Sequence, residues 1–130
     1  MPMTKLSLQA IFDTYRLHPE FLGTNIEDVN QRGGFDSTLL HIASRTGNLE
    51  HVKALVEAGA DINSRGDLAN TPLHDAALCG QAHAVALLLS LGADYKLKNE
   101  FEQTALDVAQ LGNKTEVCKV LNKEGRQRHK

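Results

Sequence analysis

The chain is poor in aromatic residues and in cysteine. Trp is absent, aromatic residues make up 5% of the 130 residues, and two cysteines occur. A core of large rings is therefore excluded, and Leu, Val and Ala must fill it. Cys79 and Cys118 lie far apart in the sequence, with no CxxC motif and no paired histidine spacing. This argues against a disulfide framework, a zinc site or a redox pair, so we expect free thiols and no metal.

Long apolar runs are also missing. Residues 1–8 become polar before an apolar region of about seven residues forms, so a secretory signal is not indicated. No run approaches the roughly 18 apolar residues that a membrane-spanning helix needs. These absences favour a cytoplasmic protein with no membrane partner.

An excess of positive charge is lacking as well. The net charge is −2, and residues 119–130 carry +4, which leaves −6 on residues 1–118. A protein that binds duplex nucleic acid is expected to be basic overall, so nucleic acid is not favoured as a partner.

What the chain does contain is a well-marked helical segment at residues 71–77. Thr71 suits a helix N-cap, and Pro72 suits the first helical position, where a missing N–H costs nothing. Leu73, Ala76 and Ala77 share one helical face, on which the small alanines allow another helix to approach closely. The pattern predicts a short helix that ends near Gly80 and a second helix from about residue 82 to Gly92.

The same pattern recurs along the chain at a fixed spacing. Moving back by 33 gives Thr38-Leu39-Leu40-His41-Ile42-Ala43, and moving forward by the same step gives Thr104-Ala105-Leu106-Asp107-Val108-Ala109. Three sets of positions keep this phase: Leu55, Leu88 and Leu121; Gly59, Gly92 and Gly125; Thr38, Thr71 and Thr104. A fixed period of this length is typical of stacked helical repeats.

A repeating unit of this length headed by Thr-Pro-Leu-His-x-Ala resembles the ankyrin repeat, and the resemblance covers residues 28–125. It implies a mainly α fold, a solenoid of stacked helix-turn-helix units with hairpin-like loops. We expect one domain: a degenerate N-terminal capping repeat (1–27), repeats 28–60 and 61–93, a C-terminal capping repeat (94–125) and a basic tail (126–130). Terminal repeats need a polar outer face, so we expect one at both ends and take the chain to be complete.

The chain departs from the family pattern at the hairpin tips. The family places Gly two residues before the Thr, where the turn needs a positive φ, but this chain has Asp36, Ala69 and Glu102. A left-handed conformation at Ala or Glu costs about 1 kcal/mol. In the third repeat Asp107 replaces His, and we expect it to close a capping box with Thr104.

Residues with catalytic potential have a structural interpretation in this sequence. His41 and His74 share a repeat phase three residues after a Thr, so we expect them to connect loops. His51 and His83 fall one position apart in the 33-residue repeat, so they do not form a repeated ligand set. We expect both to lie on the solvent-exposed surface. Cys79 and His83 are the one pair that resembles a nucleophile with a base, but no third orienting group is evident. We therefore expect no enzyme, no catalytic residue and no cofactor.

Function is better sought at positions that vary within the scaffold. The resemblance implies that partners bind the hairpin tips and the first helix of each repeat, which together form a concave face. When the three repeats are aligned at their spacing of 33, the tips have one position that is basic, one that is apolar and one that is polar in every repeat. We call these the basic, apolar and polar columns. Positions on the first helices vary more. The candidate partner-binding residues are Arg32, Phe35, Arg45, Arg65, Leu68, Asn70, Asp75, Leu78, Lys98, Phe101, Gln103 and Leu111.

Exposed apolar side chains flanked by cations have the composition of a protein-binding patch. We therefore predict an adaptor or stoichiometric inhibitor that is a monomer when free and binds a protein with an acidic and apolar surface. An antidote that masks a toxin or an enzyme is a narrower version of this hypothesis, by analogy alone. The alternatives are an enzyme or small-molecule binder, for which no convergent polar cluster is present, and self-association through the apolar tips. Tip aromatics that only pack on the neighbouring hairpin would serve none of these functions.

Overall fold

The computed structural model describes residues 7–128, and among these residues it contains helices and loops but no strand. The α-helices are α1 (Leu8–Tyr15), α2 (Leu39–Thr46), α3 (Leu49–Glu57), α4 (Pro72–Leu78), α5 (Ala82–Ser90), α6 (Ala105–Leu111) and α7 (Thr115–Arg128). Two short 3₁₀ segments are η1 (Pro19–Phe21) and η2 (Asp67–Ala69). The predicted helix-turn-helix repeats are thereby confirmed, although the hairpin-like loops form no strand pairs.

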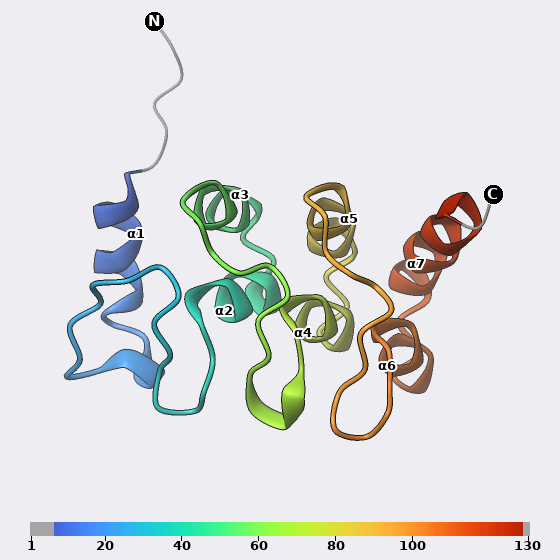
Figure 1. Cartoon of the computed structure of the whole chain (residues 1–130), viewed down its shortest axis with the longest axis horizontal. Helices are drawn as coiled ribbons and strands as arrows, with labels where there is room; N and C mark the ends of the chain where they lie inside the picture. The colour runs from blue at the N-terminus through green and yellow to red at the C-terminus, as the bar shows by residue number, and fades with distance from the viewer. Residues whose placement is uncertain (1–6, 129–130) are drawn as a thin grey trace, which may run out of the picture.

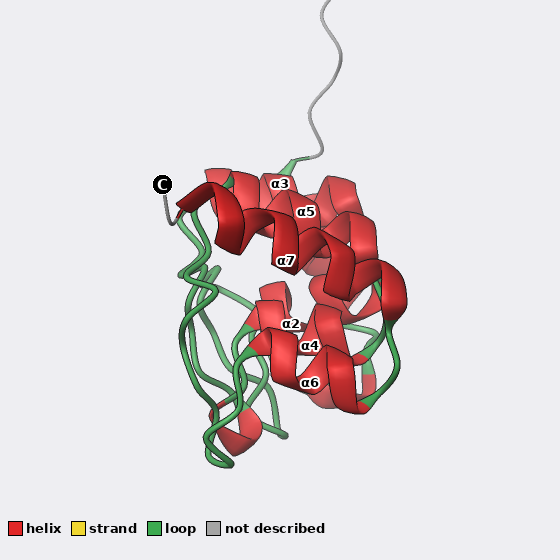
Figure 2. Ribbon diagram, turned by 90° about the vertical axis from the view of Figure 1, so that its right-hand side faces the viewer, coloured by secondary structure: helices red, strands yellow, loops and turns green. Residues whose placement is uncertain are grey.

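The helices lie in two layers. Helices α2, α4 and α6 stand side by side in one layer, α3, α5 and α7 form the other, and α1 lies crosswise at the end of the stack next to α3 (Figure 1). The loops that connect successive pairs run together along one edge of the layers and project beyond the first layer as tips (Figure 2).

Each first helix begins with the same local contacts. The side chains of Thr38, Thr71 and Thr104 each cap their helix, and the residue three positions later completes a capping box. These boxes satisfy N–H groups that would otherwise lack a partner at the helix start. The box predicted between Thr104 and Asp107 is therefore confirmed.

The helix ends follow the repeat phase with one exception. Gly47 and Gly80 have φ values of 76° and 72°, and Asn113 takes the same place in the third repeat with φ 56°. Gly125 shares the phase of Gly92, which follows the end of α5, but α7 runs through Gly125 to residue 128. Of the expected basic tail, residues 126–128 lie in α7, and residues 129–130 lie outside the described part.

The core consists of small and branched side chains that repeat in phase. Ala43, Ala76 and Ala109 are fully buried in α2, α4 and α6, which allows these helices to approach closely. Leu55 and Leu88 are equally buried in the second layer. The scarcity of aromatic residues therefore reflects close helix packing.

The N-terminal segment packs against the first helix pair. Helix α1 packs against α3 and buries Ile11, Phe12 and Tyr15. The outer face of this segment is less polar than expected, because Leu17 and Leu22 are 79% and 62% exposed. The predicted helical residue Leu6 lies outside the described residues.

Glu20 in η1 connects this segment to the first tip. Its carbonyl oxygen accepts a hydrogen bond from Gly34 N at 2.9 Å, and its Oε2 accepts one from Ser37 N at 2.7 Å. Gly33 is required nearby, because a Cβ there would lie 2.7 Å from Glu20 Cγ.

Within residues 7–128, no helix is long and apolar enough to cross a membrane.

Candidate functional site

Two buried histidines hold neighbouring repeats together. His41 Nδ1 accepts a hydrogen bond from Thr38 N at 3.1 Å, and His41 Nε2 lies 2.9 Å from the carbonyl oxygen of Asn70 in the next tip. His74 repeats the arrangement, with its Nε2 2.8 Å from Gln103 O. Because a carbonyl only accepts, Nε2 donates in each case, and the neutral ring fits both contacts. The expected role of these histidines as loop connectors is confirmed.

The environment keeps these rings neutral. Burial lowers the pKa of both His41 and His74, against the opposing influence of the Asp75 carboxylate. The folded state therefore binds fewer protons than the unfolded state as the pH falls through the normal histidine range. Stability contributed in this way is present above the unfolded pKa of about 6.5 and is lost as the pH decreases.

The three tips have the strained geometry that the sequence predicts. Asp36, Ala69 and Glu102 have φ values of 69°, 60° and 62°, in the left-handed region that favours glycine. Leu68 is also left-handed, with φ 58°, so the middle tip carries two such residues in succession. Its strain is therefore greater than the sequence predicted.

An apolar side chain stands exposed at each tip. Phe35, Leu68 and Phe101 are 71%, 42% and 61% exposed. Their tips lie along the same edge of the molecule (Figure 2), and Glu100 N donates a hydrogen bond to Leu68 O at 2.9 Å, which joins the second tip to the third. We call Phe35, Leu68 and Phe101 the tip ridge. Most of the surface of the Phe35 and Phe101 rings is therefore not packed against other residues of the chain.

The basic column has a structural role that the sequence did not reveal. Arg32 donates to the carbonyl oxygen of Asp36 at 3.0 Å and to Ser64 Oγ at 3.0 Å in the next loop. Arg65 donates to Lys98 O at 2.6 Å, again in the next loop. These guanidinium groups therefore join successive loops, while the Lys98 side chain is exposed.

The polar column also stabilises the tips. Asn70 and Gln103 are half-buried, and Asn99 Nδ2 donates to Asn70 Oδ1 at 3.0 Å and to Gln103 Oε1 at 3.1 Å. Sequence reasoning missed Asn99, which is 6% exposed. The sequence feature that could have revealed it is the repeat alignment, in which Gly33 and Gly66 occupy the same position at the other two tips.

The first-helix positions divide into a paired and an exposed group. Arg45 Nη2 lies 3.2 Å from Asp75 Oδ2, and the Asp75 side chain is 11% exposed. Burial raises the pKa of the Asp75 carboxyl, while His41 and Arg45 oppose that shift. Leu78 and Leu111 are 54% and 72% exposed at the C-terminal ends of α4 and α6.

The residues weighed for catalysis do not form a reactive site. Burial raises the pKa of the Cys79 thiol, and the Asp75 carboxylate raises it further, whereas a nucleophilic cysteine needs a lowered pKa. Both cysteines are free, as expected. His83 is exposed, but the expectation of a solvated His51 is wrong, because Tyr15 Oη lies 2.9 Å from its Nδ1 and the two rings meet edge to face. Burial against this partner from α1 lowers the pKa of His51.

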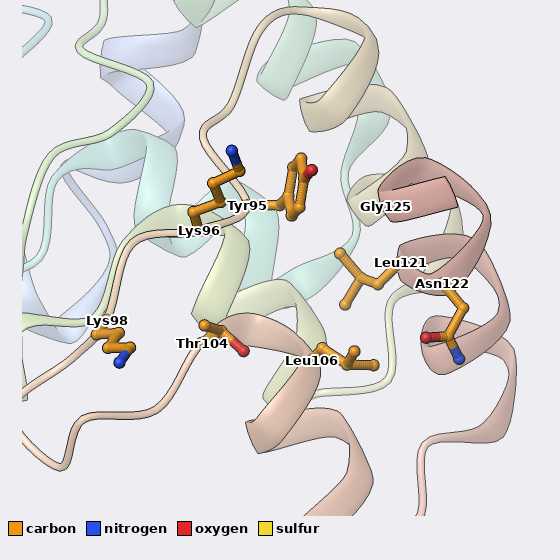
Figure 3. Close-up of a pocket in the computed structure, with 8 residues that line it drawn as sticks. All are labelled: Tyr95, Lys96, Lys98, Thr104, Leu106, Leu121, Asn122 and Gly125. Atoms are coloured by element: carbon orange, nitrogen blue, oxygen red, sulfur yellow. The ribbon is translucent and has the colours of Figure 1, made fainter. Parts of the chain in front are cut away.

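A pocket of about 740 Å³ lies at the C-terminal end of the stack (Figure 3). Leu106 and Leu121 line this pocket. They correspond, one repeat later, to Leu73 and Leu88, which are buried because the third repeat packs over them. It is thus the stacking face of the last repeat. Its lysines, Lys96 and Lys98, diverge rather than converge on one point. Among the described residues, no group of three or more histidine, cysteine or acidic side chains is placed to hold a metal ion.

Helix pairs stacked in register, each started by a Thr capping box and joined by projecting tips, define a helical repeat solenoid. A sequence model described as ankyrin repeats (3 copies) matches residues 8–99, and the chain belongs to the ankyrin repeat family. No curated protein matches the chain. Ankyrin repeats are generally protein–protein interaction modules, and the family is typically not enzymatic.

Proposed function

We propose that this chain acts as an adaptor or stoichiometric inhibitor, binding its partner protein through the tip ridge and the exposed face of the first helices. The observation that carries the proposal is the exposure of Phe35 and Phe101, at 71% and 61%, on tips whose backbones are held by hydrogen bonds. Aromatic side chains are frequent anchors of protein interfaces. Because the tips are already ordered, binding needs little further loss of conformational freedom.

The size of the ridge supports an energetic role in binding. Covering about 100 Å² of each ring would contribute roughly 2.5 kcal/mol per ring at about 25 cal/mol per Å². The same rings contribute little to folding, since surface substitutions usually change stability by less than about 0.5 kcal/mol. Substitutions at Phe35 and Phe101 should therefore weaken partner binding without lowering the stability of the chain.

The experiment is affinity capture from the native source, followed by mass spectrometry and affinity measurement with the identified partner. Part of the roughly 5 kcal/mol from the two rings is offset by the costs of association, so we expect Phe35→Ala/Phe101→Ala to weaken that affinity by at least about 2 kcal/mol, roughly thirtyfold, with an unchanged melting temperature. Leu49→Ala is the matched control, because Leu49 is a 40% exposed apolar residue at the start of α3, away from the tips. Equal affinity of the double variant and the wild-type chain would remove the ridge from the binding surface.

Light scattering separates this function from self-association. A constitutive dimer that dissociates in the double variant would assign the ridge to a second copy of the chain.

A further inference from the structure

Every apolar residue of the tip ridge has an exposed carboxylate as its immediate neighbour. Asp36 follows Phe35, Asp67 precedes Leu68, and Phe101 is enclosed by two acidic residues. These four acidic residues are all exposed: Asp36, Asp67, Glu100 and Glu102. A partner that covers the ridge must therefore also cover or approach these carboxylates.

The tips carry three cations against these four carboxylates: Arg32, Arg65 and the exposed Lys98. Arg32 lies 3.6 Å from the Asp36 carboxylate, and its guanidinium also donates to backbone and side-chain oxygens of two loops. Arg65 donates to the carbonyl oxygens of Ala69 and Lys98, at 3.3 Å and 2.6 Å. These contacts fix both side chains on the loops, while each guanidinium keeps its charge.

The adjoining helix face adds no positive charge. Arg45, its basic member, is paired with Asp75 at 3.2 Å and donates to Ser37 Oγ at 2.8 Å. Leu78 and Leu111, exposed at the C-terminal ends of α4 and α6, are apolar. The surface that a partner meets is therefore apolar, with a border in which exposed carboxylates outnumber cations.

Resting on the proposed function, we infer that the tip ridge docks a partner segment in which lysine or arginine residues flank apolar side chains. Sequence alone predicted an acidic partner, because the column Arg32, Arg65 and Lys98 was counted as available charge. The contacts place two of those three cations in the loop framework, and charge complementarity then favours a basic segment.

The probe is a random-peptide library displayed on phage, selected on the immobilised full chain at low ionic strength. Peptides that bind Phe35→Ala/Phe101→Ala equally well are discarded, so the remaining pool depends on the ridge. We expect this pool to be enriched in Lys and Arg beside aromatic or aliphatic residues. We also expect its affinities to fall as salt increases, because exposed charges are screened within about 10 Å at 0.1 M salt.

A pair of charge reversals tests the role of the border. Glu100→Lys at the third tip should lower the affinity of the chain for the selected peptides by about threefold or more at low salt. Glu50→Lys on α3 changes the net charge equally at an exposed position away from the tips, and should leave the affinity unchanged.

The outcomes distinguish this inference from the proposed function. A ridge-dependent pool enriched in Asp and Glu, or equal effects of Glu100→Lys and Glu50→Lys, would overturn the basic partner while leaving the ridge as a binding surface. A failure to select any ridge-dependent peptide would overturn both. A dimer held together by Phe35 and Phe101 would show that a second copy occupies the ridge, and would also overturn the inference.

Discussion

Removing the bridge at His74 tests how the repeats are coupled. His74 is 2% exposed and contacts both its own capping threonine and the carbonyl oxygen of Gln103 in the next tip. In His74→Asn the side-chain oxygen can still accept from Thr71 N, but the shorter side chain no longer reaches Gln103. In His74→Ala both contacts are lost.

The magnitudes follow from the burial of the groups left behind. Gln103 is half-buried, so water can replace part of its lost bond, and we expect His74→Asn to cost about 1 to 2 kcal/mol. Thr71 is 1% exposed, so its unpaired N–H adds about 1 to 2 kcal/mol in His74→Ala. The alanine variant should therefore lose about 2 to 4 kcal/mol in total.

Urea unfolding followed by circular dichroism measures these differences as shifts in the midpoint. Asp107→Asn is the matched control, because Asp107 closes the same capping box without a bridge to a further tip. We expect this control to change the free energy of unfolding by less than about 0.5 kcal/mol, the usual range for substitutions that break no buried contact. Losses of under about 0.5 kcal/mol in both His74 variants, below the usual contribution of one hydrogen bond, would refute the coupling of the repeats through this ring.

Three other predictions concern stability. Leu88→Ala should cost about 2 to 5 kcal/mol by thermal or urea unfolding, because it empties a fully buried site between helices, and a loss below about 1 kcal/mol would contradict the repeat phase. Ala69→Gly should raise the stability by about 0.5 to 1 kcal/mol, since relief of a left-handed alanine exceeds the added chain entropy; a lower urea midpoint would contradict the strain. Stability should fall from pH 7.5 to about 5.5, because the pKa values of His41, His51 and His74 are lowered in the folded state and the unfolded chain binds more protons; a flat urea midpoint over this range would argue against these shifts.

The repeat phase made most of the fold predictable. A residue at a given phase meets the same neighbours in each unit, so the capping threonines, the bridging histidines and the left-handed Asn113 follow from one well-marked repeat. The N-terminal segment keeps little of that phase. For this reason the contact of Tyr15 with His51 could not be found from the sequence.

The binding surface was only partly predictable, because periodicity does not distinguish a binding residue from a structural one. Phe35 and Phe101 are exposed as a ridge requires, yet Arg32 and Arg65 repeat just as regularly and join loops. The direction in which a long side chain turns depends on loop carbonyls that a sequence pattern does not place. Asn99 was missed for a related reason, since two of the three repeats have glycine at its phase.

Amide hydrogen exchange of the chain, free and bound to its partner, tests the central claim most directly. If the partner docks on the tip ridge, protection should rise at residues 33–37, 66–70 and 99–103 and change little along α3 and α5. Protection confined to α3 and α5, with the three tips unchanged, would contradict the account.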